Sequence, residues 1–425
     1  MKSDLEPNGL SQPNREIRKH DLSYLFACLG ILIALSAFFY RAVFLGKPIA
    51  KLGLLSQIDA ILNPSLKDAI ISIGKDPSGY LIFFPNGHFA ETMWSRLIFP
   101  LWNPLVACGY PLMGDPQSFI HSPAHLLALF SSPEMYNTGL LLEIAAGGLG
   151  MIVLGRVLSL SAMASAFAAL AFVLCPRILE QVDIGNNECL FPWILSCFLW
   201  LASTPSVGRA LLTGLACGVL VLMAHPETSF FAILFSGLCS FFVVLSRGVV
   251  LASENSKLGL LTPNSREKFL ANLMLALKLF SLAALVSVCI AAPVVFPFLE
   301  FLKNAFLYKE TIAVPVIQWW QFRDGFLSSQ GPEPYFIGSV ALLFLPLALC
   351  QTSRVPFCLA FCALICAFIC LPQGLFLEFL SRKPYSFVAT LYGIPMLALL
   401  LATLSGFGFD RLFRTATKTH LALFF

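Results

Sequence analysis

Acidic, basic and imidazole side chains stand inside or directly beside long apolar segments of this 425-residue chain. Glu143 lies within one such segment, the motif His225–Thr228 (His-Pro-Glu-Thr) follows another, and Arg41 and Glu300 end two more. An ionisable group costs about 2.5–3.5 kcal/mol at the centre of a membrane helix, so such groups mark functional sites by default. Each residue alone is explained by interface anchoring or by an internal ion pair. Together they predict a polar site just below one membrane surface.

Two carboxylates in the polar stretch after the first apolar segment are further candidates for catalysis. Asp59 stands in Leu55–Ala60, and Asp115 stands in Gly109–Ser118. A carboxylate can act as a general base, or it can hold a divalent cation against a phosphate. An aspartate in a solvated loop is more often only a turn residue. The residues alone leave both alternatives open.

Four cysteines at helical spacing form a stripe at Cys358, Cys362, Cys366 and Cys370. Such a stripe either binds a metal or undergoes redox chemistry, or it consists of small residues that let helices pack closely in lipid. The absence of histidine or carboxylate from the stripe favours packing.

The composition is that of a chain that lies mostly in lipid. Hydrophobic residues make up 58% of it, charged residues 12%, and the mean hydropathy is +0.81, whereas soluble chains are about 45–50% apolar and about 25% charged. These values exclude a soluble enzyme, and a net charge of +4 offers no basic surface to nucleic acid. We predict an all-α polytopic membrane protein with about ten transmembrane helices, at 22–45, 137–155, 159–175, 189–203, 210–224, 229–246, 275–298, 335–351, 356–371 and 387–407.

The long segment between the first two spans is the main interruption of this pattern. It is rich in Pro, Gly, Trp, Asn and Asp, and ordered loops of this length are usually functional. Arg156, Arg209 and Arg354 occupy short loops on the opposite side, with no acidic residue close in sequence, as the positive-inside rule expects of cytoplasmic loops. The predicted organisation is a cytoplasmic tail 1–21, a transmembrane domain 22–407 that includes the large extracytoplasmic loop 46–136, and a cytoplasmic tail 408–425.

Several segments carry motifs that run in order along nearly the whole chain. They are Pro100–Pro104 with Gly109–Ser118 in the first loop, then Ala224–Phe231, Ala292–Glu300 and Ser381–Pro384. These resemble the signature elements of the YfhO family of bacterial membrane proteins, the first-loop elements being the most specific. Many family members are longer, with more spans after the point where this chain stops, so the resemblance is to a shortened member or to one piece of a split protein. The histidine-proline element of that family often continues with Gln, where this chain has Glu227.

YfhO-like proteins are similar to GT-C glycosyltransferases, which are multi-span enzymes that use polyprenyl-phosphate sugars as donors. The resemblance implies a GT-C-like fold in a bacterial plasma membrane and transfer of a sugar to an envelope polymer or lipid acceptor on the outer face. It places the acidic active-site position at Asp59, which we expect to be the catalytic base. We expect substrate contacts from Asp115, His225, Glu227, Arg382 and Lys383, the last two at the lipid phosphate, and Mg²⁺ or Mn²⁺ held by Asp59 or Asp115.

Two other classes of function remain open at this point. A transporter or flippase would bind a lipid-linked substrate without chemistry, but many transporters show internal repeats, and this sequence has none that we detect. A non-catalytic scaffold of an envelope assembly would need no active-site base.

The charge distribution predicts the membrane topology. Cysteines introduced singly between residues 60 and 130 should react with an impermeant reagent from outside, because this loop is expected to be extracytoplasmic. Cysteines between residues 250 and 270 should react only after permeabilisation. The opposite labelling of these two loops would overturn the predicted orientation.

Overall fold

The computed structural model describes residues 12–45, 84–106, 109–115, 118, 133–181, 187–254, 263–304, 323, 326–327, 336–351, 353–370 and 390–415. Within these residues the secondary structure is helical, apart from one isolated antiparallel bridge between Asn103 and Tyr110. The all-α class predicted from the sequence is therefore confirmed.

Within the described residues, each of the ten apolar segments expected to span a membrane contains a helix. In the described part of the chain, five helices are long and apolar enough to cross a membrane: α1 (Gln12–Phe38), α7 (Pro133–Val157), α12 (Pro226–Glu254), α13 (Pro263–Asn304) and α18 (Ile394–Thr415). The other segments form the shorter apolar helices α8 (Ala162–Val173), α10 (Phe191–Ser203), α11 (Val207–Met223), α15 (Ser339–Leu349) and α16 (Val355–Cys370). The chain thus has the helices of a multi-pass membrane protein.

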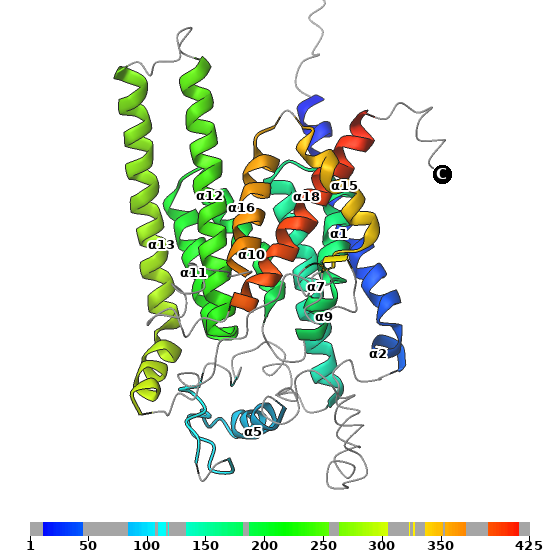
Figure 1. Cartoon of the computed structure of the whole chain (residues 1–425). Coiled ribbons are helices and arrows are strands. Elements are labelled where there is room, and N and C mark those ends of the chain that lie inside the picture. The colour runs from blue at the N-terminus through cyan, green and yellow to red at the C-terminus, as the bar shows by residue number, and fades with distance from the viewer. Residues whose placement is uncertain are drawn as a thin grey trace, which may run out of the picture.

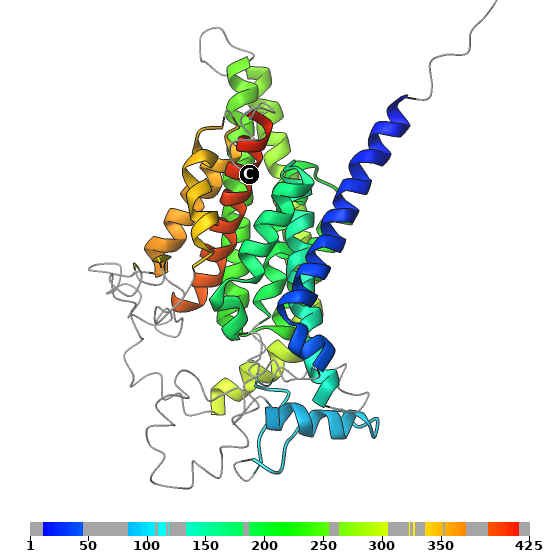
Figure 2. The same cartoon turned by 90° about the vertical axis from the view of Figure 1, so that its right-hand side faces the viewer.

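The helices form one bundle with α18 near its centre (Figure 1). The apolar part of α18 is 78% buried, whereas that of α1 is only 17% buried. Figure 2 shows α1 crossing the outside of the bundle obliquely. Apolar side chains such as Phe26 on α1 and Leu285 on α13 are exposed, as expected of surfaces that face lipid. A large continuous core joins α7, α8, α10, α12, α16 and α18.

The two ends of the bundle differ in structure. One end carries the short helix α5 (Phe84–Trp94), and we call it the α5 end (Figure 1). The first residues of α1 and the last residues of α18 that the structure describes lie at the opposite side of the bundle, away from α5. There Arg156 pairs with Asp21 at 2.6 Å, although no acid neighbours it in sequence. Asp410 pairs with Arg414 at 2.7 Å and accepts the backbone N–H of Ser161, the N-cap of α8.

These contacts extend two helices beyond the boundaries expected from the sequence. Helix α1 begins at Gln12, inside the expected tail 1–21, and α18 continues to Thr415, past residue 407. The ion pairs and the Asp410 cap give these polar turns partners, so the helices do not end where the apolar sequence ends.

The cysteine stripe packs α16 against its neighbours. Cys362, Cys366 and Cys370 are fully buried in the core. The Cys358 thiol lies 3.6 Å from the Phe242 carbonyl of α12, and the Cys366 thiol lies 3.4 Å from the carbonyl of Gly393. These thiols occupy close helix contacts, as the packing interpretation predicts.

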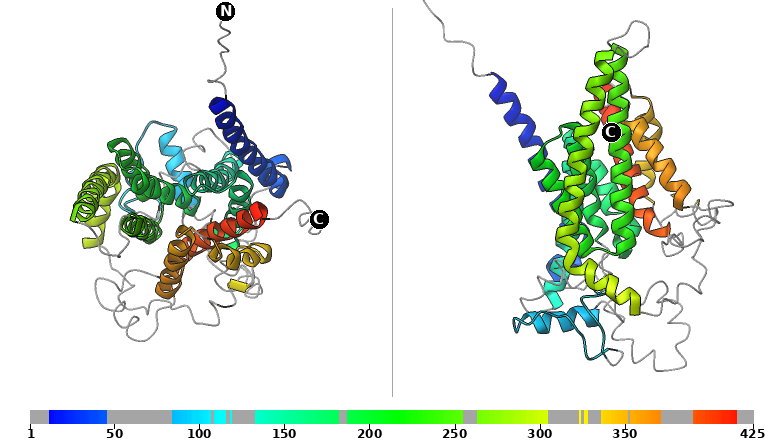
Figure 3. Two further views of the ribbon diagram at one scale, coloured as in Figure 1. Left: turned by 90° about the horizontal axis from the view of Figure 1, so that it is seen from above. Right: turned by 90° about the vertical axis from the view of Figure 1, so that its left-hand side faces the viewer.

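Helices α11 and α13 approach each other through two glycines of α11. A Cβ atom on Gly218 would lie 2.6 Å from the Cβ of Ile290, and one on Gly214 would lie 2.7 Å from the Cβ of Val286. The Gly214–Gly218 spacing is the small-residue pattern that brings membrane helices into backbone contact. Beyond this contact α13 bends toward the α5 end, where Pro293 and Pro297 interrupt its hydrogen bonds (Figure 3).

The contact between α11 and α13 predicts different effects on stability for leucine at two glycine positions of α11. Gly218→Leu should lower the free energy of unfolding by about 1–3 kcal/mol, because the added side chain has no space beside Ile290. Gly208→Leu on the same helix is the control, since a Cβ there meets no atom within 4 Å. Thermal unfolding of the detergent-solubilised protein measures both. Equal stability of the two variants would contradict the close contact.

Candidate functional site

The first-loop motif folds as a compact turn, which we call the hairpin and define as residues 99–106 and 109–115. Asn103 and Tyr110 exchange both backbone hydrogen bonds at 2.8 Å, and the Asn103 side chain accepts the backbone N–H of Leu105 at 3.0 Å. Gly109 has a φ of +119°, and a Cβ atom there would clash with the ring of Trp102. The Asn and Gly of the motif are therefore required by the fold of the hairpin itself.

The hairpin is docked on the ends of α11 and α13. Leu112 is fully buried in a small core with Ala90 of α5 and Val294 of α13, and Leu222 of α11 packs against this core. The amide of Asn103 donates to the amide oxygen of Asn86 on α5 at 3.1 Å, and both side chains are buried. The hairpin, α5 and two helix ends thus form one packed unit.

Asp115 ends the hairpin as a buried carboxylate and is only 8% exposed. The hydroxyl of Tyr110 donates to Asp115 Oδ2. Burial, and then the negative charge of Asp115 and this hydrogen bond, raise the pKa of Tyr110 well above its ordinary value. The ring of Tyr110 packs edge-on against Phe301 at the end of α13, with ring centroids 6.4 Å apart. Asp115 is therefore not a solvated turn residue.

The histidine-proline motif forms the turn between α11 and α12. Ala224 ends α11, and Pro226 occupies the first turn of α12, where a missing N–H costs nothing. The imidazole of His225 stacks on the ring of Tyr392, in the 3₁₀ turn η9 (Thr390–Gly393), with centroids 4.4 Å apart and planes at 8°. His225 and Glu227 are both buried.

His225 and Glu227 contact each other at the start of α12. His225 Nδ1 accepts the backbone N–H of Glu227, with 3.4 Å between the two nitrogens. The same Nδ1 lies 3.6 Å from the Glu227 carboxylate oxygen Oε2. The imidazole is therefore positioned by its own turn as well as by Tyr392.

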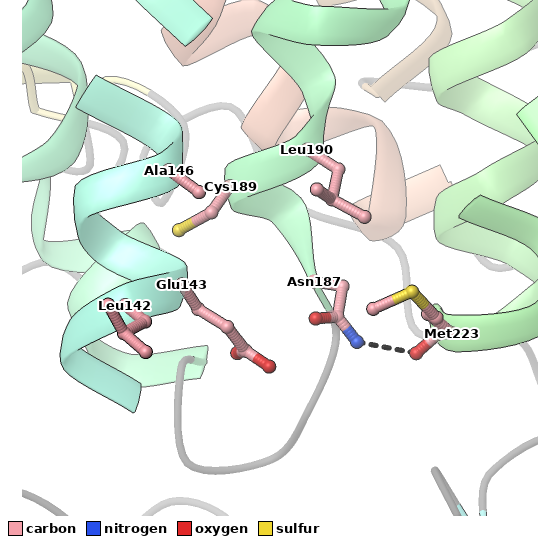
Figure 4. A pocket seen from close by; sticks show the side chains of 7 residues that line it. All are labelled: Leu142, Glu143, Ala146, Asn187, Cys189, Leu190 and Met223. Atoms are coloured by element: carbon pink, nitrogen blue, oxygen red, sulfur yellow. Dashed lines mark hydrogen bonds between the residues drawn. The ribbon is translucent and has the colours of Figure 1, made fainter. Parts of the chain in front are cut away.

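A cavity of about 230 Å³ lies between α7, the 3₁₀ turn η6 (Glu188–Leu190) and the end of α11. Figure 4 shows the Glu143 carboxylate extending from α7 toward Asn187, whose amide oxygen faces it. The Asn187 amide nitrogen donates to the carbonyl of Met223. The wall is completed by Leu142, Ala146, Cys189, Leu190 and the Met223 side chain. The cavity is apolar except for two oxygen-bearing groups.

A buried ion pair beside this cavity was not singled out by the sequence. Arg177 on α9 (Pro176–Gln181) lies 3.9 Å from Glu188, and their side chains are 6% and 2% exposed. Asn187, the residue before Glu188, adopts the left-handed backbone conformation with φ +53°. The sequence pointed to this ion pair only through the polar residues in the short connection between the segments expected at 159–175 and 189–203.

The turn between α11 and α12 joins these parts. Leu222 packs in the hairpin core, the Met223 carbonyl accepts from Asn187, and His225 stacks on Tyr392. Three residues within the four-residue stretch 222–225 therefore contact the hairpin, the cavity and the element that precedes α18. We call the hairpin, the turn and the cavity together the candidate site.

Three of the expected site residues fall inside this arrangement. Asp115, His225 and Glu227 are buried on elements at the α5 end. Asp59, Arg382 and Lys383 lie outside the described residues, so their roles stay predictions.

The expected divalent cation has no ligand set in the described part of the chain, where no three His, Cys, Asp or Glu side chains converge for a metal ion. Asp115 is described, but its carboxylate accepts the Tyr110 hydroxyl, and one carboxylate alone does not make such a site. The cation stays a prediction that depends on Asp59.

Comparison with known proteins gives no relative. No family model, curated protein or solved structure matches this chain.

The hydrogen bond between Tyr110 and Asp115 is expected to stabilise the hairpin against local opening. Tyr110→Phe keeps the ring against Phe301 but removes a hydrogen bond to a charged group, worth about 1.5–3 kcal/mol. Backbone amides of Asn103 and Tyr110 should then exchange with deuterium about 10- to 100-fold faster. Tyr40→Phe, whose hydroxyl accepts from Arg41, is the control and should leave the hairpin unchanged. Unaltered exchange in Tyr110→Phe would show that this bond does not hold the hairpin.

Proposed function

We propose that this protein is a membrane glycosyltransferase with a GT-C-like fold of about ten transmembrane helices. It transfers a sugar from a polyprenyl-phosphate carrier to an envelope polymer or lipid acceptor. The class rests on the resemblance of its motifs to the YfhO family, and the geometry of the candidate site supports it.

The observation that carries the proposal is the position of buried polar groups at the α5 end. Glu143, Glu227 and Asp115 are each less than 9% exposed. Glu227 lies in the first turn of α12, Asp115 ends the docked hairpin, and Glu143 lines the cavity from within α7, beside the end of α11. A reaction between a lipid phosphate and a water-soluble acceptor needs polar groups at the depth of the lipid headgroup. Buried carboxylates at one end of an apolar bundle meet this need.

The proposed roles follow the chemistry of sugar transfer. The acceptor hydroxyl must lose a proton, and we assign that step to Asp59 as general base. The acceptor oxygen forms a bond to the anomeric carbon of the sugar while the bond from that carbon to the phosphate oxygen breaks, and the lipid phosphate departs with its negative charge. Arg382 and Lys383 stabilise that charge, Arg382 through its bidentate fork. The first-loop hairpin closes the site from the aqueous side.

The orientation that suits this reaction places the α5 end at the outer face of a bacterial plasma membrane, with both termini in the cytoplasm. Arg156 and Arg414 lie at the opposite end, beside Asp21 and Asp410. Basic residues on the inner side agree with the positive-inside rule.

The direct experiment is transfer in vitro with a radiolabelled polyprenyl-phosphate sugar and purified full-length protein. Label moving to an acceptor would support an enzyme. Binding of the donor without transfer would favour a transporter or flippase. Neither binding nor transfer would favour a scaffold.

Asp59 gives the sharpest prediction of this proposal. Asp59→Asn keeps the size of the side chain but removes the base, so transfer should fall by about 10²–10⁴-fold with unchanged expression. Asp68→Asn and Asp76→Asn in the same loop are the controls and should lose little activity. Full activity of Asp59→Asn together with an inactive Asp115→Asn would move the base to Asp115.

A further inference from the structure

We infer that an exposed apolar patch at the α5 end inserts into the membrane leaflet at that end of the bundle. The patch lies just after α5 and on the first arm of the hairpin, and it consists of Leu97, Ile98, Phe99, Leu101, Trp102 and Leu105. Its partner is a lipid surface, at the boundary between the headgroups and the acyl chains. This inference goes beyond the proposed function, because it needs only a membrane protein and holds equally for an enzyme, a transporter or a scaffold.

The patch is too exposed to belong to the small core of the docked hairpin. Leu97 and Leu105 are 95% and 80% exposed, and Leu101 and Trp102 are each more than half exposed. Single exposed apolar side chains are ordinary on a protein surface. Six of them within nine residues, in contrast, mark a surface that contacts a membrane or another protein.

The turn after α5 holds the patch in an outward position. The backbone N–H of Leu97 donates to the carbonyl of Trp94 at 2.8 Å, and the ring of Trp94 packs edge-on against Phe99 with centroids 4.8 Å apart. Leu97 has a φ of +57°, a left-handed conformation that leucine rarely adopts because its Cβ then crowds the following carbonyl. The turn therefore directs Leu97 outward although this backbone conformation costs free energy.

The position of the hairpin along α13 places the patch at the membrane boundary. The apolar stretch of α13 that is long enough to cross a membrane runs from Leu273 to Phe301. The hairpin docks within the last turns of this stretch, near Val294 and Phe301. In the same turns Phe296 is 65% exposed, as expected of a side chain that contacts lipid. The hairpin that carries the patch is therefore docked at a depth that lipid still reaches.

Helix α5 has the orientation and the polarity of an element at a membrane surface. Figures 2 and 3 show α5 lying across the axis of the bundle, which is parallel to the plane of a surrounding membrane. Its Ala90 is fully buried in the small core, whereas His88 is exposed and lies 3.4 Å from Glu91. Directly after the helix, the exposed Arg96 stands beside Leu97. A basic residue next to an apolar patch suits the level of the lipid phosphates.

The composition of the patch favours lipid over a protein partner. Its residues are Leu, Ile and Phe with one Trp, the types that lie on the apolar face of elements at a membrane interface. The energetic centres of protein interfaces favour Tyr, Trp and Arg and contain few Leu. The chain is also already held in a bilayer, so contact with lipid requires no association of two proteins. A second copy of this chain is the alternative occupant that the experiment must separate.

Site-specific photocross-linking identifies the occupant. p-Benzoylphenylalanine replaces Leu97 or Leu105 in the full-length protein, which is then purified, reconstituted into vesicles of phosphatidylcholine and phosphatidylglycerol, and irradiated. Both positions are largely exposed, so the larger side chain requires no repacking. Lipid adducts, measured from the mass of the intact protein, should form at both positions with a yield within about threefold of that at the exposed Leu285 of α13. The same replacement of His88 is the control and should give about tenfold fewer adducts, because His88 lies on the polar face of α5.

A second measurement uses the reactivity of introduced cysteines in the same vesicles. Leu97→Cys and Leu105→Cys should react with an impermeant maleimide about tenfold more slowly than His88→Cys, because a thiol in apolar surroundings stays protonated. These two positions are then exceptions to the labelling expected of residues 60–130 from outside. Lipid adducts no more frequent than at His88, or maleimide reaction as fast as at His88, would overturn the insertion. Cross-links between two protein chains in place of lipid adducts would overturn it in favour of a second copy.

Discussion

The apolar surroundings of the bundle are the constraint on which the arrangement of this protein depends. A polar group buried there without a partner costs several kcal/mol, so polar groups persist only where partners can be built. Within the described helices, interior hydroxyls such as those of Ser196 and Thr403 bond back to carbonyls of their own helix. Buried charged groups such as Glu227 and Asp410 lie instead near helix ends, where turns supply backbone groups and neighbouring side chains. Glu143 lies inside α7 but faces the turn η6.

This constraint explains why the two ends of the bundle have different roles. At the end opposite α5, Asp410 pairs with Arg414 of its own helix and accepts the Ser161 N–H, and this second bond joins α18 to the start of α8. At the α5 end, the turn between α11 and α12 contacts the hairpin on one side and Asn187 on the other. The close α11–α13 contact sets the position of that turn. The position of the candidate site at the α5 end is therefore a consequence of helix packing as well as of sequence motifs.

The sequence predicted the helical class because long apolar runs are a strong signal. It indicated Glu143 and the His225 motif as candidates because ionisable groups in such runs are rare. It could not predict the pairing of Arg177 with Glu188, because the pair forms only when α9 and η6 fold against each other. The sequence also indicated the first-loop motif, but it did not show why the fold needs the Asn and Gly of that motif. The hydrogen bonds of Asn103 and the positive φ of Gly109 depend on a hairpin that local propensity does not define.

The candidate site depends on docking of the hairpin against the end of α13. An engineered disulfide bond between the two elements measures whether they are in contact. A Cβ atom on Gly114 would lie 3.4 Å from the Cβ of Phe301, close to the roughly 3.5–4.5 Å of a disulfide. In a background without native cysteines, Gly114→Cys with Phe301→Cys should cross-link in isolated membranes under mild oxidation. Gly208→Cys with Phe301→Cys, at opposite ends of the bundle, should not. Equal cross-linking of the two pairs, or none in the first while the protein stays folded, would contradict the docked hairpin and the candidate site it closes.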